Sequence, residues 1–180
     1  HYRGYPIEQL ARQSSYLEVC YLLIHGELPT QTEMTAWERR LRRHTHLHEN
    51  FTDLIQAFPS SAHPMVVLSS AVAALAGYYP HSVDPFDPET VELATVLLLA
   101  KTPTIAAYAH KHSLRQELPA PSKSETFAGN FLRMAFTTPE VPYEVDPVIA
   151  RALDILFILH ADHEQNCSTS IVRMVGSAHA

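Results

Sequence analysis

The stretch ILFILHADHEQNCSTS, residues 155–170, joins an apolar run to a dense group of polar side chains. Residues Val148 to Leu159 are mostly apolar, which indicates a buried helix. Two imidazoles, an amide pair and small hydroxyls follow directly, and no other window of the chain concentrates such groups. Because these groups can hold a small anionic substrate, the sequence predicts a polar site at the edge of a packed interior.

The spacing within this stretch leaves more than one interpretation open. On a helix, His160 and His163 share a face, and Glu164 follows His160 by one turn, where it can accept a hydrogen bond from the ring. A neighbouring acid holds a histidine in one tautomer. The residues alone fit a binding site, histidines satisfied within a core, or a metal-dependent hydrolase, which elemental analysis for zinc or iron would reveal.

The motif HADHEQN-x-STS-x-VR-x-x-GS, residues 160–177, closely resembles the central signature of the bacterial citrate synthases. Further segments resemble that family in the family's own order: Tyr2–Ala11, Tyr16–Thr30, His63–Met65 and Phe127–Leu132. The resemblance covers essentially the whole chain, and several ordered motifs are far more specific than one. It implies an all-α fold in which residues 1–180 form part of the multi-helical large domain, with the small domain absent.

The resemblance also implies an activity and roles for individual residues. Citrate synthase is an acyltransferase of the tricarboxylic acid cycle that condenses acetyl-CoA with oxaloacetate to citrate and CoA. His163 matches the histidine that donates to oxaloacetate, and Asn166 and Ser168 match positions that line the same pocket. His160 matches a nearby histidine that we expect to orient the site rather than bind substrate. No cofactor is implied beyond acetyl-CoA as a substrate, and no metal.

The family's condensation machinery has no counterpart in these residues. Its two catalytic histidines lie in later motifs of the type GPxHGG and GFGH, and its aspartate base and substrate arginines are also downstream; none of these motifs occurs here. We therefore expect no catalytic residue in this chain and no activity from residues 1–180 alone. Since the chain opens on His1 rather than Met and stops at Ala180 without a terminating signal, we expect a piece of a longer protein.

A second group of histidines, His44, His46 and His48, follows a basic run. Alternate histidines could converge on a metal from a strand, but on a helix only the outer two share a face, so the helical surroundings favour a non-metal role. In some citrate synthases the basic residues of this region belong to a regulatory NADH site. This chain keeps His44 and Tyr79 of that pattern, but Leu97 stands where those enzymes carry an arginine, which argues against NADH control and leaves regulation by NADH or another nucleotide open.

Composition and charge limit the partners and the compartment. The net charge is −6, and no basic stripe is available to neutralise phosphates, which argues against nucleic acid. The basic patch Arg39–Arg43 fits a solvated helix face. Cys20 and Cys167, the only cysteines, suit a reducing cytoplasm. The apolar stretches Val66–Ala76 and Val91–Ala100 are shorter than the roughly 18 residues that a bilayer requires, so we expect no membrane association.

Helix start and stop signals recur along the chain, and two-residue alternation does not. The expected helices are one opened by Pro6, then Ser15–His25, Thr30–Arg43, Pro64–Tyr79, Glu89–His112, Ser124–Phe136 and Pro147–His160. Gly26 is expected to cap the second helix, and Thr30 and Glu33 to form a capping box at the start of the third. A break or kink is expected at Pro103.

The expected helix at Pro64–Tyr79 has apolar or small residues all the way round, so it must be covered on every side. In the citrate synthase family this helix belongs to the dimer interface, which implies a homodimer or a hexamer of dimers. A non-catalytic helical dimerisation module is the alternative from a different functional class. Within the same fold, 2-methylcitrate synthase, which uses propionyl-CoA, is the other alternative.

Overall fold

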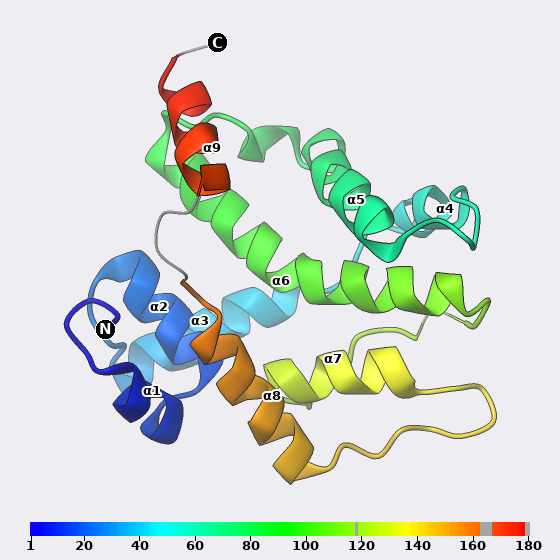
Figure 1. Ribbon diagram of the computed structural model, residues 1–180, viewed down its shortest axis with the longest axis horizontal. Coiled ribbons are helices and arrows are strands. Elements are labelled where there is room, and N and C mark those ends of the chain that lie inside the picture. Colours follow the sequence, from blue (N-terminus) through cyan, green and yellow to red (C-terminus); the bar gives the residue numbers. More distant parts are fainter. Residues whose placement is uncertain (118, 163–166, 179–180) are drawn as a thin grey trace. The chain divides into compact units, whose positions relative to one another are not determined.

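The computed structural model describes residues 1–117, 119–162 and 167–178, and this part of the chain is helical and has no β-strand (Figure 1). The all-α class predicted from the sequence is confirmed. The elements are α1 Ile7–Gln13, α2 Tyr16–His25, α3 Gln31–His44, α4 Phe51–Gln56, α5 Pro64–Tyr78, η1 Pro80–Ser82, α6 Pro88–Ser113, α7 Phe127–Phe136, α8 Pro147–Leu159 and α9 Cys167–Ser177. They divide into two compact units, His1–Pro29 with Ala152–Ala180, and Thr30–Arg151.

The larger unit is built around α6, the longest helix in the described residues. Helices α3, α4, α5 and α7 and the short turn η1 all contact it (Figure 1). The helix begins at Asp87, whose carboxylate accepts a hydrogen bond from the Thr90 backbone N–H at 3.1 Å, with Pro88 in the first turn. Aspartate followed by proline is a favourable helix start because proline has no N–H to leave unsatisfied. Residues 87–88 therefore fix where the central helix begins.

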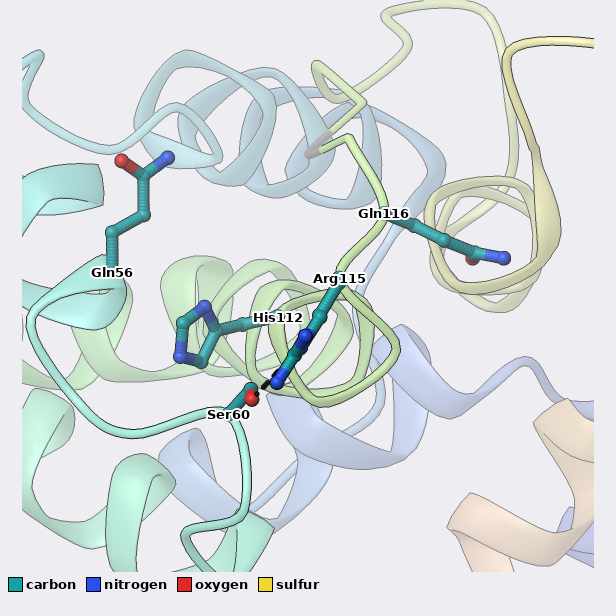
Figure 2. A pocket seen from close by; sticks show the side chains of 5 residues that line it. All are labelled: Gln56, Ser60, His112, Arg115 and Gln116. Carbon is teal, nitrogen blue, oxygen red and sulfur yellow. Dashed lines mark hydrogen bonds between the residues drawn. The ribbon is translucent and has the colours of Figure 1, made fainter.

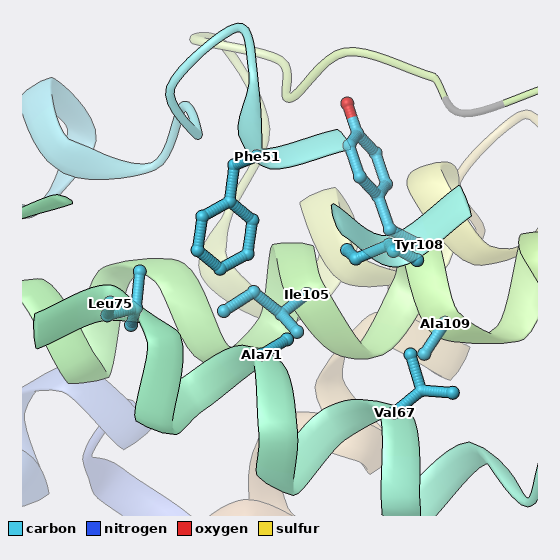
Figure 3. Close-up of a cluster of buried hydrophobic side chains, with 8 residues drawn as sticks. Phe51, Val67, Ala71, Leu75, Ile105, Tyr108 and Ala109 are labelled. Atoms are coloured by element: carbon cyan, nitrogen blue, oxygen red, sulfur yellow. The ribbon is translucent and has the colours of Figure 1, made fainter. Parts of the chain in front are cut away.

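The core of this unit lies between α4, α5 and α6. Val67, Ala71 and Leu75 recur along one face of α5 and pack against Ile105 and other residues of α6 (Figure 3). Phe51 and Ile55 close the cluster from α4, and neither exposes any surface. Helix α5 was expected to be covered on every side, but the described residues bury only this face of it. Met65 and Val66, on the other side of the helix, are 60% and 53% exposed.

The sequence predicted a break or kink at Pro103. No break occurs, because a single helix runs from Pro88 to Ser113, but α6 bends near its middle (Figure 1). A proline inside a helix removes one hydrogen bond and costs about 3 kcal/mol. The tertiary contacts on both sides of Pro103, including the fully buried Ala100 and Ile105, offset that cost.

The uninterrupted α6 is longer than the apolar stretches recognised in the sequence. Its 26 residues make it, by length and composition alone, capable of crossing a membrane. The central helix of a globular core meets the same criterion, and the contacts of α6 with four other helices are those of a core helix. Nothing in the described residues points to a membrane.

Helix α7 also differs from its prediction, because it begins at Phe127 rather than near Ser124. Thr126 is the cap: its hydroxyl oxygen accepts a hydrogen bond of 3.0 Å from the Gly129 N–H. A Cβ atom on Gly129 would lie 2.9 Å from that hydroxyl oxygen and 3.2 Å from a methyl group of Val145. Gly129 thus lets the chain pass close to its own cap.

The smaller unit combines α1, α2 and the C-terminal part of α8. Tyr2, Leu10, Val19, Leu22 and Ile158 form its core. The predicted capping signals are confirmed: Gly26 ends α2 with φ +92°, the left-handed conformation in which glycine has no steric penalty. The carboxylate of Asp154 on α8 accepts a hydrogen bond of 3.2 Å from the Tyr16 N–H, so α8 caps the start of α2.

Candidate functional site

The predicted site begins where α8 ends. Ile158 is fully buried, whereas Leu156, Leu159 and His160 are exposed. The last turn tightens: the His160 N–H donates to the Leu156 and Phe157 carbonyl oxygens at 3.1 and 3.2 Å. Residues 160–162 are no longer helical. Helix α8 was predicted to reach His160 and ends one residue earlier, at Leu159; whether His160 and His163 share a face lies outside the described residues.

The ring of His160 has a definite orientation. Its Nδ1 lies 2.7 Å from the backbone carbonyl oxygen of Leu156, one turn back along α8. A carbonyl oxygen can only accept, so Nδ1 carries the proton and donates it. In the neutral ring, Nε2 is then the acceptor nitrogen. The expectation that His160 orients part of the site rather than holding the substrate stays a prediction.

The chain beyond His160 is held by a residue that the sequence analysis did not single out. The hydroxyl of Tyr2 lies 3.0 Å from the Ile158 carbonyl oxygen and 3.2 Å from both the backbone nitrogen and the carbonyl oxygen of Asp162. No local pattern could have shown this contact, because 156 residues separate Tyr2 from Ile158.

Two of the predicted substrate-binding residues, His163 and Asn166, lie outside the described residues, as does Glu164. Ser168 is described: it is exposed and lies in the first turn of α9. The first N–H groups of a helix have no intrahelical acceptor and favour a negatively charged ligand. The role of Ser168 in a substrate pocket stays a prediction.

Two pockets of the larger unit have the polar lining of a possible binding site. The first, of about 420 Å³, is lined by Gln56, Ser60, His112, Arg115 and Gln116 (Figure 2). Its charged and titratable side chains already have partners, since Arg115 Nε donates to Ser60 Oγ at 3.2 Å and His112 Nε2 lies 2.7 Å from the Phe58 carbonyl oxygen. These contacts tie the C-terminal end of α6 to the loop after α4.

The second pocket, of about 570 Å³, lies along the basic face of α3. It is lined by Thr35, Glu38, Arg39, Arg42, Arg43, His46 and Lys123. The sequence predicted a solvated helix face here, and the exposure of Arg39, Arg42 and Arg43 confirms it.

The residues compared with a regulatory NADH site lie around the C-terminal end of α3. Lys101 Nζ donates to the His44 carbonyl oxygen at 2.8 Å and lies 4.9 Å from the centre of the Tyr79 ring. Burial is the main cause that lowers the pKa of His44, and the nearby Lys101 adds to it. Leu97, which replaces an arginine of that pattern, is buried in the core and offers no donor.

Of the two candidate metal sites, the one formed by His160, His163 and Glu164 lies mostly outside the described residues, and the one at His44, His46 and His48 is described. Among residues 1–117, 119–162 and 167–178, no three histidine, cysteine, aspartate or glutamate side chains come together as metal ligands. Helix α3 ends at His44, so His44 and His48 do not share a helical face. His48 Nδ1 instead accepts a hydrogen bond of 3.2 Å from the Asn50 N–H.

Comparisons with known proteins agree on one family. The family model described as citrate synthase, C-terminal domain, matches residues 1–180. Citrate synthase 1 of Mycobacterium tuberculosis is 57% identical over 179 residues, which are 99% of this chain and 42% of that protein. Citrate synthase of Corynebacterium glutamicum is 50% identical over 179 residues, 99% of this chain and 41% of that protein.

Comparison of the fold with solved structures points to the same family. The crystal structure of citrate synthase from Pyrobaculum aerophilum superimposes with a TM-score of 0.86 at 38% sequence identity, covering 99% of this chain and 45% of that one. The chain thus spans less than half the length of the relatives that it matches.

Proposed function

The chain belongs to the citrate synthase family, and from this premise we propose that the protein containing it condenses acetyl-CoA with oxaloacetate to give citrate and CoA. The observation that carries the proposal is the match of residues 1–180 to the family, together with 57% identity to a citrate synthase over nearly the whole chain. These residues contribute to the large helical domain. The catalytic acids and bases come from other parts of the protein.

In this proposal the segment after α8 holds oxaloacetate. His163 donates a hydrogen bond to it, Asn166 and Ser168 line the pocket, and His160 orients the neighbouring chain. A donor is most effective where negative charge develops, which here is the ketone oxygen attacked by the acetyl carbon. The exposed position of Ser168 in the first turn of α9 supports this assignment, because that turn favours an anion.

The test is His163→Ala in the protein that contains this chain. Removing one donor to a developing charge typically costs about 2.7–4 kcal/mol. We therefore expect a raised KM for oxaloacetate and a kcat lowered by about two to three orders of magnitude. His81→Ala, which removes an exposed imidazole in η1, is the control and should leave both constants unchanged. Unchanged kinetics in His163→Ala would contradict the role of His163.

The same enzyme assay distinguishes the two acyl donors. We expect a higher kcat/KM with acetyl-CoA than with propionyl-CoA, and the opposite ratio would identify a 2-methylcitrate synthase instead. Residues 1–180 purified alone should form no citrate, since the motifs with the catalytic histidines are absent from them. Citrate formation by that segment would falsify the assignment of the catalytic residues to other parts of the protein. No cofactor and no metal beyond the two substrates is proposed.

We also propose that the protein forms a homodimer, or a hexamer of dimers, through α5. The support is the apolar outer side of this helix, where Met65 and Val66 are 60% and 53% exposed. Val66→Glu should shift the protein to smaller species in analytical ultracentrifugation, because it would bury a charge. Val83→Glu, at a residue that is 55% exposed and follows η1, should not. Equal sedimentation of both variants and the parent would contradict the assignment of the interface to α5.

The proposed compartment is the cytoplasm. Cys20 and Cys167 are both free thiols, which suits a reducing environment. Cell fractionation should recover the protein with other cytoplasmic enzymes, and neither nucleic acid nor a membrane is proposed as a partner. Recovery in the membrane fraction would contradict this placement.

A further inference from the structure

The N-terminal turn of the chain holds Tyr2 in a fixed place. The N–H of Tyr2 donates to the carbonyl oxygen of Tyr5 and the N–H of Tyr5 donates to the carbonyl oxygen of Tyr2, each at 2.9 Å. The two residues between them, Arg3 and Gly4, have φ +50° and +92°. Positive φ at both central positions is the pattern of a type I′ turn. Arg3 also donates to the Leu23 carbonyl oxygen at 2.8 Å, which ties this turn to α2.

The side chain of Tyr2 carries its hydroxyl into the core of the smaller unit. Tyr2 is 6% exposed and packs with Leu10, Val19, Leu22 and Ile158. A buried tyrosine hydroxyl requires hydrogen-bond partners, because burying it without them costs free energy. Its partners here are backbone groups at the end of α8, so the burial of Tyr2 brings the first residues of the chain to the last turn of that helix.

The geometry assigns both functions of the hydroxyl. It has one proton to donate and can also accept. The Ile158 carbonyl oxygen at 3.0 Å is its nearest acceptor, and the Asp162 N–H at 3.2 Å is its donor. A single side chain thereby bonds to one carbonyl group near the end of α8, which also accepts from the Ala161 N–H at 3.3 Å, and to one N–H group beyond that end. The hydroxyl thus fixes the path of the backbone from Ile158 to Asp162.

We propose that Tyr2 is a positioning residue for oxaloacetate binding, acting through His163. Asp162 is the residue directly before His163 in the chain, so the hydroxyl of Tyr2 fixes the backbone to which the substrate-binding residue is joined. A displacement of about 1 Å far from the chemistry can lower the rate of an enzyme substantially. This inference rests on the proposed function of His163, and it adds the N-terminal turn to the parts of the protein that the site requires.

The test is Tyr2→Phe in the protein that contains this chain. It removes the hydroxyl and keeps the ring in the core. A hydrogen bond of this kind contributes about 1 kcal/mol net, so we expect an approximately fivefold rise in the KM for oxaloacetate. The KM for acetyl-CoA should stay within twofold of its original value. Oxaloacetate affinity measured directly by calorimetry should fall by the same factor as the KM rises.

Tyr5→Phe is the matched control. Tyr5 lies in the same turn and packs against the same core, but no side-chain hydrogen bond of its hydroxyl is found among the described residues. Its variant should leave both KM values unchanged. The proposal is wrong if Tyr2→Phe changes the two KM values by the same factor, or leaves both KM values unchanged. A lowered unfolding temperature together with either result would show that the hydroxyl has only a structural role.

A double mutant separates this inference from the proposed function. If Tyr2 acts through His163, Tyr2→Phe should have no further effect on oxaloacetate affinity in the His163→Ala background, because the two effects are not additive. A fivefold effect that persists in that background overturns the inference alone. If His163→Ala itself leaves oxaloacetate affinity unchanged, the proposed function of His163 fails first.

Discussion

The ammonium nitrogen of Lys101, in the middle of α6, lies 2.8 Å from the carbonyl oxygen of His44, the last residue of α3. It donates a second hydrogen bond to the carbonyl oxygen of His46 and is 1% exposed. The C-terminal end of a helix has carbonyl groups without intrahelical donors. Lys101 supplies these donors from a neighbouring helix and so joins α3 to α6.

The buried Lys101 predicts a pH dependence of stability. Burial lowers its pKa from 10.5 to about 8 in the folded protein. Between pH 8 and 10.5 the unfolded chain therefore binds more protons at this residue than the folded one, so its contribution to the free energy of unfolding rises with pH. The slope is at most about 1.4 kcal/mol per pH unit.

Urea denaturation of the parent and of Lys101→Met across this pH range tests the prediction. The parent should gain stability relative to the variant as the pH rises from 8 to 10.5, and the difference should level off outside this range. Subtracting the variant removes the contributions of all other titrating groups. A difference that is constant with pH would show that Lys101 titrates at its ordinary pKa.

The close approach at the start of α7 predicts that Gly129→Ala destabilises the protein. The new methyl group would lie 2.9 Å from Thr126 Oγ1, the atom that caps the helix. Overpacking of this kind costs about 1–3 kcal/mol. Gly176→Ala in α9 is the control: its Cβ would meet nothing within 4 Å. Alanine is favoured over glycine in a helix by up to about 1 kcal/mol. In thermal denaturation the unfolding temperature should therefore fall for Gly129→Ala and rise for the control.

The capping box of α3 predicts a cost for Thr30→Ala. Thr30 Oγ1 accepts a hydrogen bond from the Glu33 N–H at 3.4 Å, and the Glu33 carboxylate accepts one from the Thr30 N–H at 2.8 Å. Loss of a threonine cap costs about 1 kcal/mol. Thr35→Ala removes an exposed hydroxyl from the same helix and should stay within about 0.5 kcal/mol of the parent. Equal unfolding midpoints for both variants would contradict the cap assignment.

Cys20 is predicted to be an unreactive thiol. It is buried in α2, and burial raises its pKa to about 12, although a hydrogen bond with Tyr16 acts in the opposite direction. Since the thiolate is the reactive form, Cys20 should resist thiol reagents at pH 8. A Cys167→Ser variant leaves Cys20 as the only thiol of this chain. Its labelling with a disulfide reagent should occur only after denaturation, and rapid labelling of the folded form would contradict the burial of Cys20.

Several features could be predicted from the sequence because they depend on neighbouring residues. The capping box at Thr30 and Glu33, the glycine that ends α2 and the Asp87-Pro88 start of α6 are all short-range arrangements of backbone and side chain. The same local logic predicted a break or kink at Pro103, where the helix is continuous but bends near its middle (Figure 1). Local preference at that position is outweighed by the packing of α6 against its neighbours, which no short window of sequence contains.

The candidate site was also predicted in part from the sequence and in part described only by the structure. Its residue types and order identified the family and named His160, His163, Asn166 and Ser168 as the segment to examine. The orientation of the His160 ring follows from the end of α8 at Leu159, one residue earlier than predicted.

The sequence by itself determined the helical class, the positions of most helix ends and the family, because these depend on local periodicity, on capping chemistry and on the order of motifs. Only the tertiary structure decided that α6 continues through Pro103, that Lys101 completes the end of α3 and that Tyr2 fixes the chain before the substrate-binding segment. Each of these depends on contacts between residues that are far apart in the chain or on different helices, and such contacts form only when the core packs.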